Sequence, residues 1–286
     1  MSKPVFHLMR PDQLMSSVVF ASPHSGCDYP EAFVRDSLLD GQAIRSSEDA
    51  FVDLLFDGAP EFGAPLLAAR APRAYVDLNR SPDELDPALI RGARRIGQNP
   101  RVASGLGVIP RVVANGRAIY AGKLPMIEAE RRLKETWYPY HEALQSLLNA
   151  AHAQFGEAIL IDCHSMPHEA MDGVARSRGQ SPEIVLGDRF GAAASGEIVD
   201  RIEAAFAGAG LVVARNAPFA GAYVTQAYGR PSRRQHAIQV EIDRAIYMDE
   251  KRIEPNAGFD PLRALLRKVT AEIVSIGFEQ MPLAAE

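Results

Sequence analysis

The sequence predicts an α/β fold of three layers, in which a mostly parallel, mixed central sheet lies between layers of helices. Two observations predict it. Short apolar or β-branched runs alternate along the chain with longer segments of helical periodicity. Several of the short runs also end in turns that carry polar side chains, and in open α/β sheets ligands bind outside the carboxyl ends of the strands. We expect a single domain over residues 1–286, with a long loop excursion at about 81–124.

Short apolar runs predict the strands, and segments of helical periodicity predict the helices. The strands are expected at Val18–Ala21, Pro65–Ala69, Ala74–Asp77, Ala158–Asp162, Glu183–Leu186, Leu211–Ala214 and Ala237–Ile242. The helices are expected at Asp49–Phe56, Ile127–Phe155, Ala192–Ala207 and Pro261–Ile276. Pro139 should kink or split the second helix, because proline removes a backbone donor and its ring clashes with the preceding turn. Asp260 and Pro261 should begin the fourth helix, as its N-cap and its first residue.

The excursion between Arg80 and Leu124 is rich in glycine, arginine and proline. A loop region of this length inside a compact domain is usually functional or mobile. It could cover a cleft, or it could be a surface excursion with a small hairpin around Asn115 and Gly116. The residues alone leave both possibilities open.

Composition excludes several classes of partner. The chain has 31 basic and 36 acidic residues, a net charge of -5 that is too small and too evenly spread to favour nucleic acid or a membrane surface. No apolar stretch reaches the roughly 20 residues that a membrane-spanning helix needs. The two cysteines and the absence of a signal-peptide pattern predict a cytoplasmic location. A small polar ligand is the expected partner.

Two histidines occupy equivalent positions at strand ends. His24 follows the run "VVFASP" and His164 follows "AILIDC". A lone histidine at a strand end is usually an ordinary hydrogen-bonded residue, but two in matching positions indicate a shared metal site. Catalytic zinc needs three protein ligands and an open fourth position, and a carboxylate commonly completes a pair of histidines. Glu48 and Asp49 are the nearest acids, although acidic residues are expected in a first helical turn in any case.

A further acidic residue stands in the middle of an expected strand. In "HAIQVEIDRAIY", Gln239, Glu241 and Asp243 share one face because side chains alternate along a strand. Glutamate is disfavoured there unless that face is wet or functional. Glu241 is therefore a candidate general base for hydrolysis, and a polar edge strand is the alternative.

The segment "APRAYVDLNRSPDELDP" supplies candidate substrate ligands. Arg73 and Arg80 flank Asp77 and Asn79. Arginine suits a carboxylate because its planar fork donates two parallel hydrogen bonds. His141 and His152 lie too far apart on one helix to share a metal, and we expect both on the helix surface.

These segments together resemble the N-formylglutamate amidohydrolase family, from about Val18 to Tyr247. The similar segments are, in order, "SPHSG", "EDAFVD", "YVDLNR", "ILIDCHSMP", "IVLGDRFG", "NAPFAGAYVTQAYG" and "AIQVEIDRAIY". A single match of this kind is weak, whereas an ordered set of seven is specific.

The resemblance implies a cytoplasmic, zinc-dependent deformylase of N-formyl-L-glutamate that acts in histidine catabolism and releases formate and glutamate. The implied fold is phosphorylase/hydrolase-like and similar to that of zinc carboxypeptidases. His24, Asp49 and His164 would be the metal ligands and Glu241 the base. The "DLNR" motif, also similar to one in aspartoacylases, implies that Asn79 and Arg80 bind substrate.

Other roles remain less closely tied to the family pattern. Arg73 and Arg230 would help to neutralise the carboxylates of the anionic N-acyl amino acid substrate. Cys27 stands where related enzymes often carry the glutamate of a His-x-x-Glu ligand pair, so the acidic ligand must come from elsewhere. Asp49 is expected in that role, and Glu48 is its rival.

Two alternative functions remain open from the sequence. The first is a zinc amidase or peptidase that acts on another N-acyl amino acid or peptide amide. The second is a non-catalytic protein that binds small carboxylates. The sequence does not decide the oligomeric state.

Overall fold

A mixed β-sheet with flanking helices forms the centre of the fold. The computed structural model describes residues 4–94, 99–173 and 181–278. Within these residues the main sheet has seven strands in the order β1-β3-β2-β6-β9-β7-β8. The strands are β1 (Phe6–Met9), β2 (Val18–Ser22), β3 (Leu66–Ala69), β6 (Ala158–Met166), β7 (Ile184–Gly187), β8 (Val213–Arg215) and β9 (Gln235–Asp243). Six of the seven expected strands are confirmed here, and the predicted α/β class is confirmed with them.

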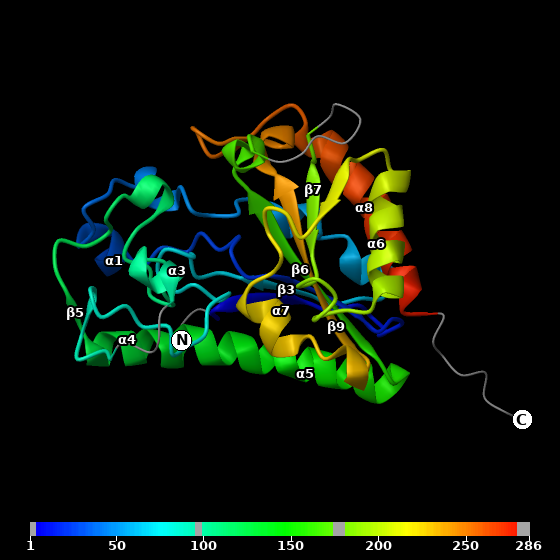
Figure 1. The fold of residues 1–286 in the computed structure, drawn as a ribbon, viewed down its shortest axis with the longest axis horizontal. Helices are drawn as coiled ribbons and strands as arrows, with labels where there is room; N and C mark the ends of the chain where they lie inside the picture. The colour runs from blue at the N-terminus through cyan, green and yellow to red at the C-terminus, as the bar shows by residue number, and fades with distance from the viewer. Residues whose placement is uncertain (1–3, 95–98, 174–180, 279–286) are drawn as a thin grey trace, which may run out of the picture. The chain divides into compact units, whose positions relative to one another are not determined.

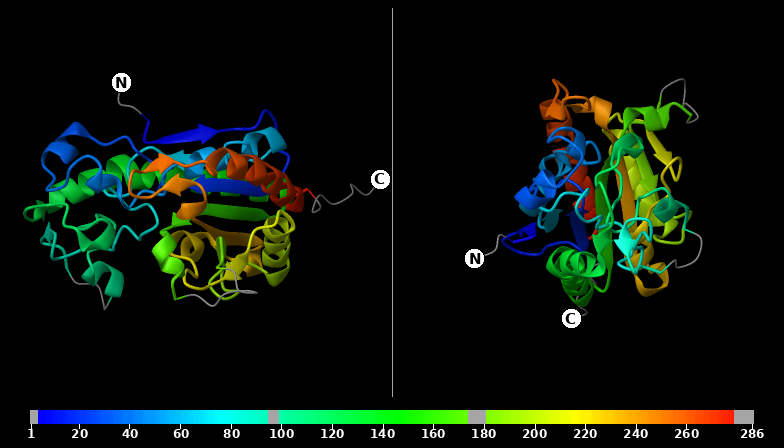
Figure 2. Two further views of the ribbon diagram at one scale, coloured as in Figure 1. Left: turned by 90° about the horizontal axis from the view of Figure 1, so that it is seen from above. Right: turned by 90° about the vertical axis from the view of Figure 1, so that its left-hand side faces the viewer.

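The three central strands run parallel. β2 pairs with β6, and β6 pairs with β9 over its whole length. Figure 2 shows these strands side by side, β2 in blue, β6 in green and β9 in orange. β7 pairs antiparallel with β9 and parallel with β8, which makes the sheet mixed. All nine residues of β6 are buried, as is typical of a parallel strand covered on both faces.

Eight α-helices and two short two-stranded sheets accompany the main sheet in the described residues. The helices are α1 (Glu31–Arg35), α2 (Val52–Leu55), α3 (Pro100–Ala103), α4 (Met126–Arg132), α5 (Tyr138–Phe155), α6 (Gly196–Gly208), α7 (Tyr223–Tyr228) and α8 (Phe259–Ile276). The short strand pairs are β4 (Ile90–Arg91) with β5 (Leu124–Pro125), and β10 (Met248–Asp249) with β11 (Glu254–Pro255). α6 and α8 pack against each other (Figure 1). No described helix has a stretch long and apolar enough to cross a membrane.

The helix ends differ in detail from the sequence predictions. The interruption expected at Pro139 takes the form of a π-helical turn, Leu133–Trp137, between α4 and α5. A wider turn relieves the clash that the proline ring would make with the carbonyl four residues earlier. The N-cap of α8 is Gly258, so Asp260 lies in the first turn and does not cap the helix.

One expected strand is wrong. Residues 73–75 form a turn and residues 76–77 have no regular structure, because the N–H groups of Tyr75 and Val76 both donate to the carbonyl oxygen of Pro72. The hairpin expected near Asn115 is confirmed as an isolated antiparallel bridge between Val112 and Ala118. Asn115 and Gly116 both have positive φ there, which is the backbone conformation of a tight Asn-Gly turn. Residues 95–98 of the 81–124 excursion lie outside the described part.

Contacts divide the chain into two compact units. Unit 1 comprises Met1–His7, Pro23–Ala50 and Ala68–Ala143, and unit 2 comprises Leu8–Ser22, Phe51–Leu67 and Leu144–Glu286. Unit 1 contains His24, Asp49 and the "DLNR" segment. Unit 2 contains most of the sheet, with His164 and Glu241.

Candidate metal and substrate site

The chain leaves β2 at Ser22 and reaches His24 two residues later. His24 is buried, and its Nε2 lies 2.8 Å from Oδ1 of Asp77. Its Nδ1 faces Oδ2 of Asp49 at 3.3 Å. Gly26 is required beside it, because a Cβ at this position would lie 2.3 Å from the carbonyl oxygen of Ala71. The turn after β2 therefore depends on a close approach of two backbone segments.

The two candidate acidic ligands have different surroundings. Glu48 is buried, and its carboxylate accepts hydrogen bonds from the Tyr29 hydroxyl at 2.6 Å and from the Arg45 guanidinium at 3.0 to 3.2 Å. Asp49 is fully buried and directs a carboxylate oxygen toward His24. The backbone N–H of Asp49 also donates to the carbonyl oxygen of His24 at 3.0 Å. The arrangement favours Asp49 over Glu48 as the acid that accompanies His24.

The expected helix at Asp49–Phe56 is reduced to α2, Val52–Leu55. Phe51 precedes it with a left-handed backbone, φ 67°, and packs edge-on against Phe259 at 6.0 Å. Ser46 is the C-cap of a 3-10 helix, Ala43–Arg45, that precedes the acidic segment. Tertiary contacts of the acidic segment override its helical pattern, so the helix-dipole explanation of its acids does not apply.

Asp77 links His24 to the candidate substrate residues. Its Oδ1 is shared by His24 Nε2 and the backbone N–H of Asn79, and its Oδ2 accepts from Nε of Arg73 at 3.1 Å. Burial by itself would raise the pKa of Asp77, but the charges of Arg73 and Arg80 and the hydrogen bond from His24 outweigh it and hold that pKa well below its usual range. The carboxylate is therefore ionised at neutral pH and can hold His24 in one orientation.

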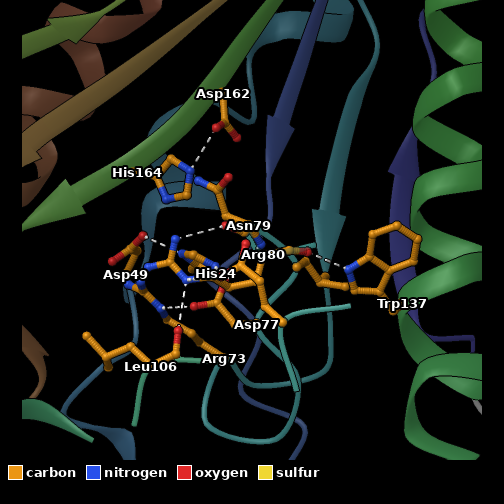
Figure 3. A network of polar contacts seen from close by, with 12 residues as sticks. His24, Asp49, Arg73, Asp77, Asn79, Arg80, Leu106, Trp137, Asp162 and His164 are labelled. Carbon is orange, nitrogen blue, oxygen red and sulfur yellow. Dashed lines mark hydrogen bonds and ion pairs between the residues drawn. The ribbon is translucent and has the colours of Figure 1, made fainter. Parts of the chain in front are cut away.

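Asn79 and Arg80, two and three residues after Asp77, are both buried. Nε of Arg80 donates to the carbonyl oxygen of Leu106 at 3.0 Å, and burial lowers the pKa of the guanidinium. Unit 1 thus places Arg73, Asn79 and Arg80 around Asp77, as Figure 3 shows. The "DLNR" residues form one connected network with His24.

In unit 2, β6 and β9 place a histidine and a glutamate side by side. His164 is the register partner of Glu241 in the parallel pair, so both side chains lie on the same face of neighbouring strands, about 4.8 Å apart. Both residues are buried. Gln239, two residues earlier on the same face, donates through its side-chain nitrogen to Oε1 of Glu241 at 2.6 Å. This contact restrains the carboxylate.

His164 has a carboxylate partner that the sequence reasoning did not single out. Its Nε2 lies 3.0 Å from Oδ2 of Asp162, which is fully buried. The signal was present in "LIDCH", because residues two apart on a strand share a face. Both histidines therefore use Nε2 to contact a buried carboxylate, Asp77 for His24 and Asp162 for His164.

His24, Asp49 and His164 form a buried group that could hold a metal ion. Each offers one ligand atom, and these atoms all lie within 4.8 Å of one another. In metal sites, a ligating histidine usually donates its other ring N–H to a carboxylate, which fixes the tautomer. Asp77 and Asp162 supply such partners at Nε2, so Nδ1 of each imidazole would carry the lone pair for a metal.

Two other residues lie elsewhere than expected. Arg230 is exposed and bridges Gln235 at the first residue of β9, six residues before Glu241. At about 3.3 Å per residue, this bridge lies about 20 Å along β9 from Glu241, so the structure does not place Arg230 beside Glu241. His141 is buried, not on the helix surface as expected, and its Nε2 contacts the carbonyl oxygen of Leu78 at 2.9 Å.

Comparisons with known proteins match nearly the whole chain. The sequence model of the N-formylglutamate amidohydrolase family matches residues 16–248. The N-formylglutamate deformylases of Pseudomonas aeruginosa and Pseudomonas putida are each 32% identical over 274 residues, covering 92% of this chain and 94% of each relative. The crystal structure of N-formylglutamate amidohydrolase from Ralstonia eutropha JMP134 has a TM-score of 0.91 at 34% identity, covering 98% of this chain and 100% of that one.

A more distant structure supports the fold alone. A protein from Agrobacterium tumefaciens has a TM-score of 0.66 at 15% identity, with 96% of each chain covered. The family match, the two bacterial relatives and the Ralstonia structure agree with the order of motifs along the chain and with the mixed sheet. The chain belongs to the N-formylglutamate amidohydrolase family, whose members hydrolyse an amide bond.

Proposed function

We propose that this protein is a zinc-dependent enzyme that hydrolyses the amide bond of N-formyl-L-glutamate, giving formate and glutamate. The buried group of His24, Asp49 and His164 is the observation that carries the proposal. Two relatives named N-formylglutamate deformylase, each covered over 94% of its length, support the choice of substrate.

The donor set fits zinc. Two imidazoles and one carboxylate leave a fourth position open, as catalytic zinc sites do, and imidazole nitrogen favours zinc over magnesium or calcium. With Nε2 of His24 donating to Asp77, Nδ1 of His24 would be a metal ligand together with the Asp49 carboxylate, whose Oδ2 lies 3.3 Å from it. When bound, the zinc ion supplies a Lewis acid for the formyl oxygen and lowers the pKa of the attacking water.

Glu241 is the proposed general base. Its carboxylate takes a proton from the water as the water attacks the formyl carbon, and then delivers it to the departing nitrogen of glutamate. The Gln239 side-chain amide, at 2.6 Å, orients the carboxylate for this transfer. A protein that only binds carboxylates needs no base on the same sheet face as His164, so this placement favours an enzyme over a binding protein.

Arg73, Asn79 and Arg80 are the proposed substrate ligands. N-formylglutamate carries two carboxylates, and arginine can bind each through paired hydrogen bonds. Arg73 donates to the same Asp77 carboxylate that contacts His24, and the charge of Arg80 also acts on this carboxylate. A neutral donor such as the Asn79 amide can orient the bound substrate through a hydrogen bond to one of its oxygens.

The substitution Glu241→Gln tests the mechanism. It removes the proton acceptor at nearly constant shape, so we expect kcat to fall by about 10²-fold to 10⁴-fold while zinc stays near one ion per chain. Glu157→Gln is the matched control: Glu157 is also buried, but it precedes the first residue of β6, at the opposite end of the strand from His164. Its variant should keep its activity.

A substrate panel tests the reaction itself. Zinc-loaded protein is assayed for formate or acetate release from N-formylglutamate, N-acetylglutamate and N-formylglutamine. Preferential cleavage of N-formylglutamate supports the proposal, whereas preference for the acetyl compound would reassign the acyl group. If zinc-loaded protein hydrolyses none of the three, the proposed function is wrong. The single-domain organisation, the cytoplasmic location and the role in histidine catabolism stay predictions.

A further inference from the structure

Two aromatic side chains stack where the π-helical turn meets α5. Trp137 is the last residue of that turn, and His141 follows one helical turn later. Their ring centroids lie 3.9 Å apart with an interplanar angle of 29°, and both side chains are buried. π-Helical turns are rare and occur frequently at functional sites, where the extra residue re-aims a side chain. Here the turn immediately precedes the stacked pair.

Both rings hold the backbone of the "DLNR" segment. The indole Nε1 of Trp137 donates to the carbonyl oxygen of Arg80 at 2.9 Å, and Nε2 of His141 contacts the carbonyl oxygen of Leu78 at 2.9 Å. A carbonyl oxygen only accepts, so the proton of His141 is on Nε2. Burial lowers the pKa of His141 to about 4, and the ring is therefore neutral at pH 7. The two contacts flank Asn79 on both sides.

The segment needs such support because its backbone is not part of the sheet. The N–H of Asp77 donates to the carbonyl oxygen of Val108, and the N–H of Asn79 donates to the Asp77 side chain. The carbonyl groups of Leu78 and Arg80 are bound by the two aromatic side chains. Buried backbone groups outside regular structure must find partners of this kind, since an unsatisfied carbonyl costs free energy comparable to a lost hydrogen bond.

We propose that Trp137 and His141 are positioning residues that set the orientation of Asn79 and Arg80 toward the substrate. The inference rests on the proposed function, because it assigns that segment to substrate binding. The pair acts through backbone carbonyls and does not touch the substrate. Its loss would therefore weaken recognition of the carboxylate and leave the reacting groups in place.

The variants Trp137→Phe and His141→Phe test this role, since each keeps an aromatic ring and removes one donor. We expect KM for N-formylglutamate to rise about tenfold, the effect of one unsatisfied buried carbonyl, with kcat changed less than about threefold and zinc content unchanged. His141→Gln retains an N–H donor and should recover part of the loss.

Ser16→Ala is the matched control. Ser16 is buried and donates its hydroxyl to the carbonyl oxygen of Val274 at 2.7 Å, so this variant also loses one side-chain donor to a buried carbonyl. It should lower the unfolding temperature without changing KM. If Trp137→Phe leaves KM at the wild-type value, or if it behaves like Ser16→Ala, the positioning role is wrong.

Intrinsic fluorescence gives a second test that needs neither a variant nor turnover. Trp137 is the only tryptophan of the chain, so its emission reports directly on the Arg80 backbone. Titration of the zinc-loaded protein with L-glutamate should change the emission in a saturable way. Saturable binding by calorimetry without a change in emission would overturn the inference. A protein that does not hydrolyse N-formylglutamate but whose emission responds to glutamate would lose the proposed function and keep the positioning role.

Discussion

Replacement of Asp77 by asparagine should weaken metal binding without unfolding the protein. The carboxylate accepts hydrogen bonds from His24 Nε2 at 2.8 Å, from the Asn79 N–H at 2.9 Å and from Arg73 Nε at 3.1 Å. An asparagine amide has one oxygen and one NH2 group, so at least one of these donors would face another donor. Asp77→Asn therefore removes the charge beside His24 and part of its orientation.

The expected magnitude follows from the position of Asp77 behind a proposed metal ligand. Loss of such a partner typically costs tenfold to hundredfold in metal affinity, or about 1.4 to 2.7 kcal/mol. The pKa of Asp77 is lowered in the folded protein, so its stabilising contribution is present above the unfolded pKa of about 4. It is lost only as the pH falls through the lower folded value. At pH 7 the Asp77 carboxylate is therefore ionised in the wild type, and Asp77→Asn should show the full loss of this charge.

A competition titration with a chromogenic zinc chelator measures the affinity. Asp86→Asn is the matched control in unit 1, because Asp86 is equally buried and accepts from Nε of Arg111 at 2.8 Å and from the N–H of Ala88 at 2.7 Å. That variant should lose stability and bind zinc as tightly as the wild type. A folded Asp77→Asn protein with wild-type zinc affinity would refute the role assigned to Asp77.

Two further substitutions test other parts of the structure. The Asp243 carboxylate, 2.7 Å from Nδ1 of His168, raises the pKa of this exposed histidine through a hydrogen bond and its charge. The contact therefore stabilises the protein fully below the unfolded pKa of about 6.5, and this stabilisation is lost as the pH rises through the higher folded pKa. The difference in melting temperature between wild type and His168→Gln should accordingly shrink between pH 6 and pH 9. A difference that stays constant over this range would contradict the prediction. Gly26→Ala should lower the free energy of unfolding by about 1–3 kcal/mol in a urea titration, because the new Cβ would clash with the backbone of Ala71. Gly41→Ala is the control and should be nearly neutral, because a Cβ at Gly41 would have no atom within 4 Å. Equal effects of the two substitutions would be inconsistent with a close backbone approach at Gly26.

Local sequence patterns were sufficient for the central strands of the sheet and for the two histidines. β2 is a wholly apolar run up to Ala21, β6 begins with one, and the apolar residues of β9 alternate with polar ones, so the positions of these strands follow from hydrophobicity and period. His24 and His164 were identified because each directly follows such a run. The polar face of β9 followed from alternation, which put Gln239 and Glu241 on one side of the strand.

The tertiary structure decided how the remaining groups are paired, because these pairings join residues distant in sequence. Glu48 and Asp49 are adjacent and chemically alike, and only the contacts of Glu48 with Tyr29 and Arg45 distinguish them. Arg230 looked like other arginines of the chain until the register of β9 placed it at the other end of the strand. His141 had the spacing of a surface residue, yet it supports a carbonyl 63 residues away. Sequence by itself determined which residue types stand at the strand ends. Tertiary packing decided which side chains lie in the candidate site and which ones hydrogen-bond to it from outside, because a hydrogen bond depends on distance in space and not on separation along the chain.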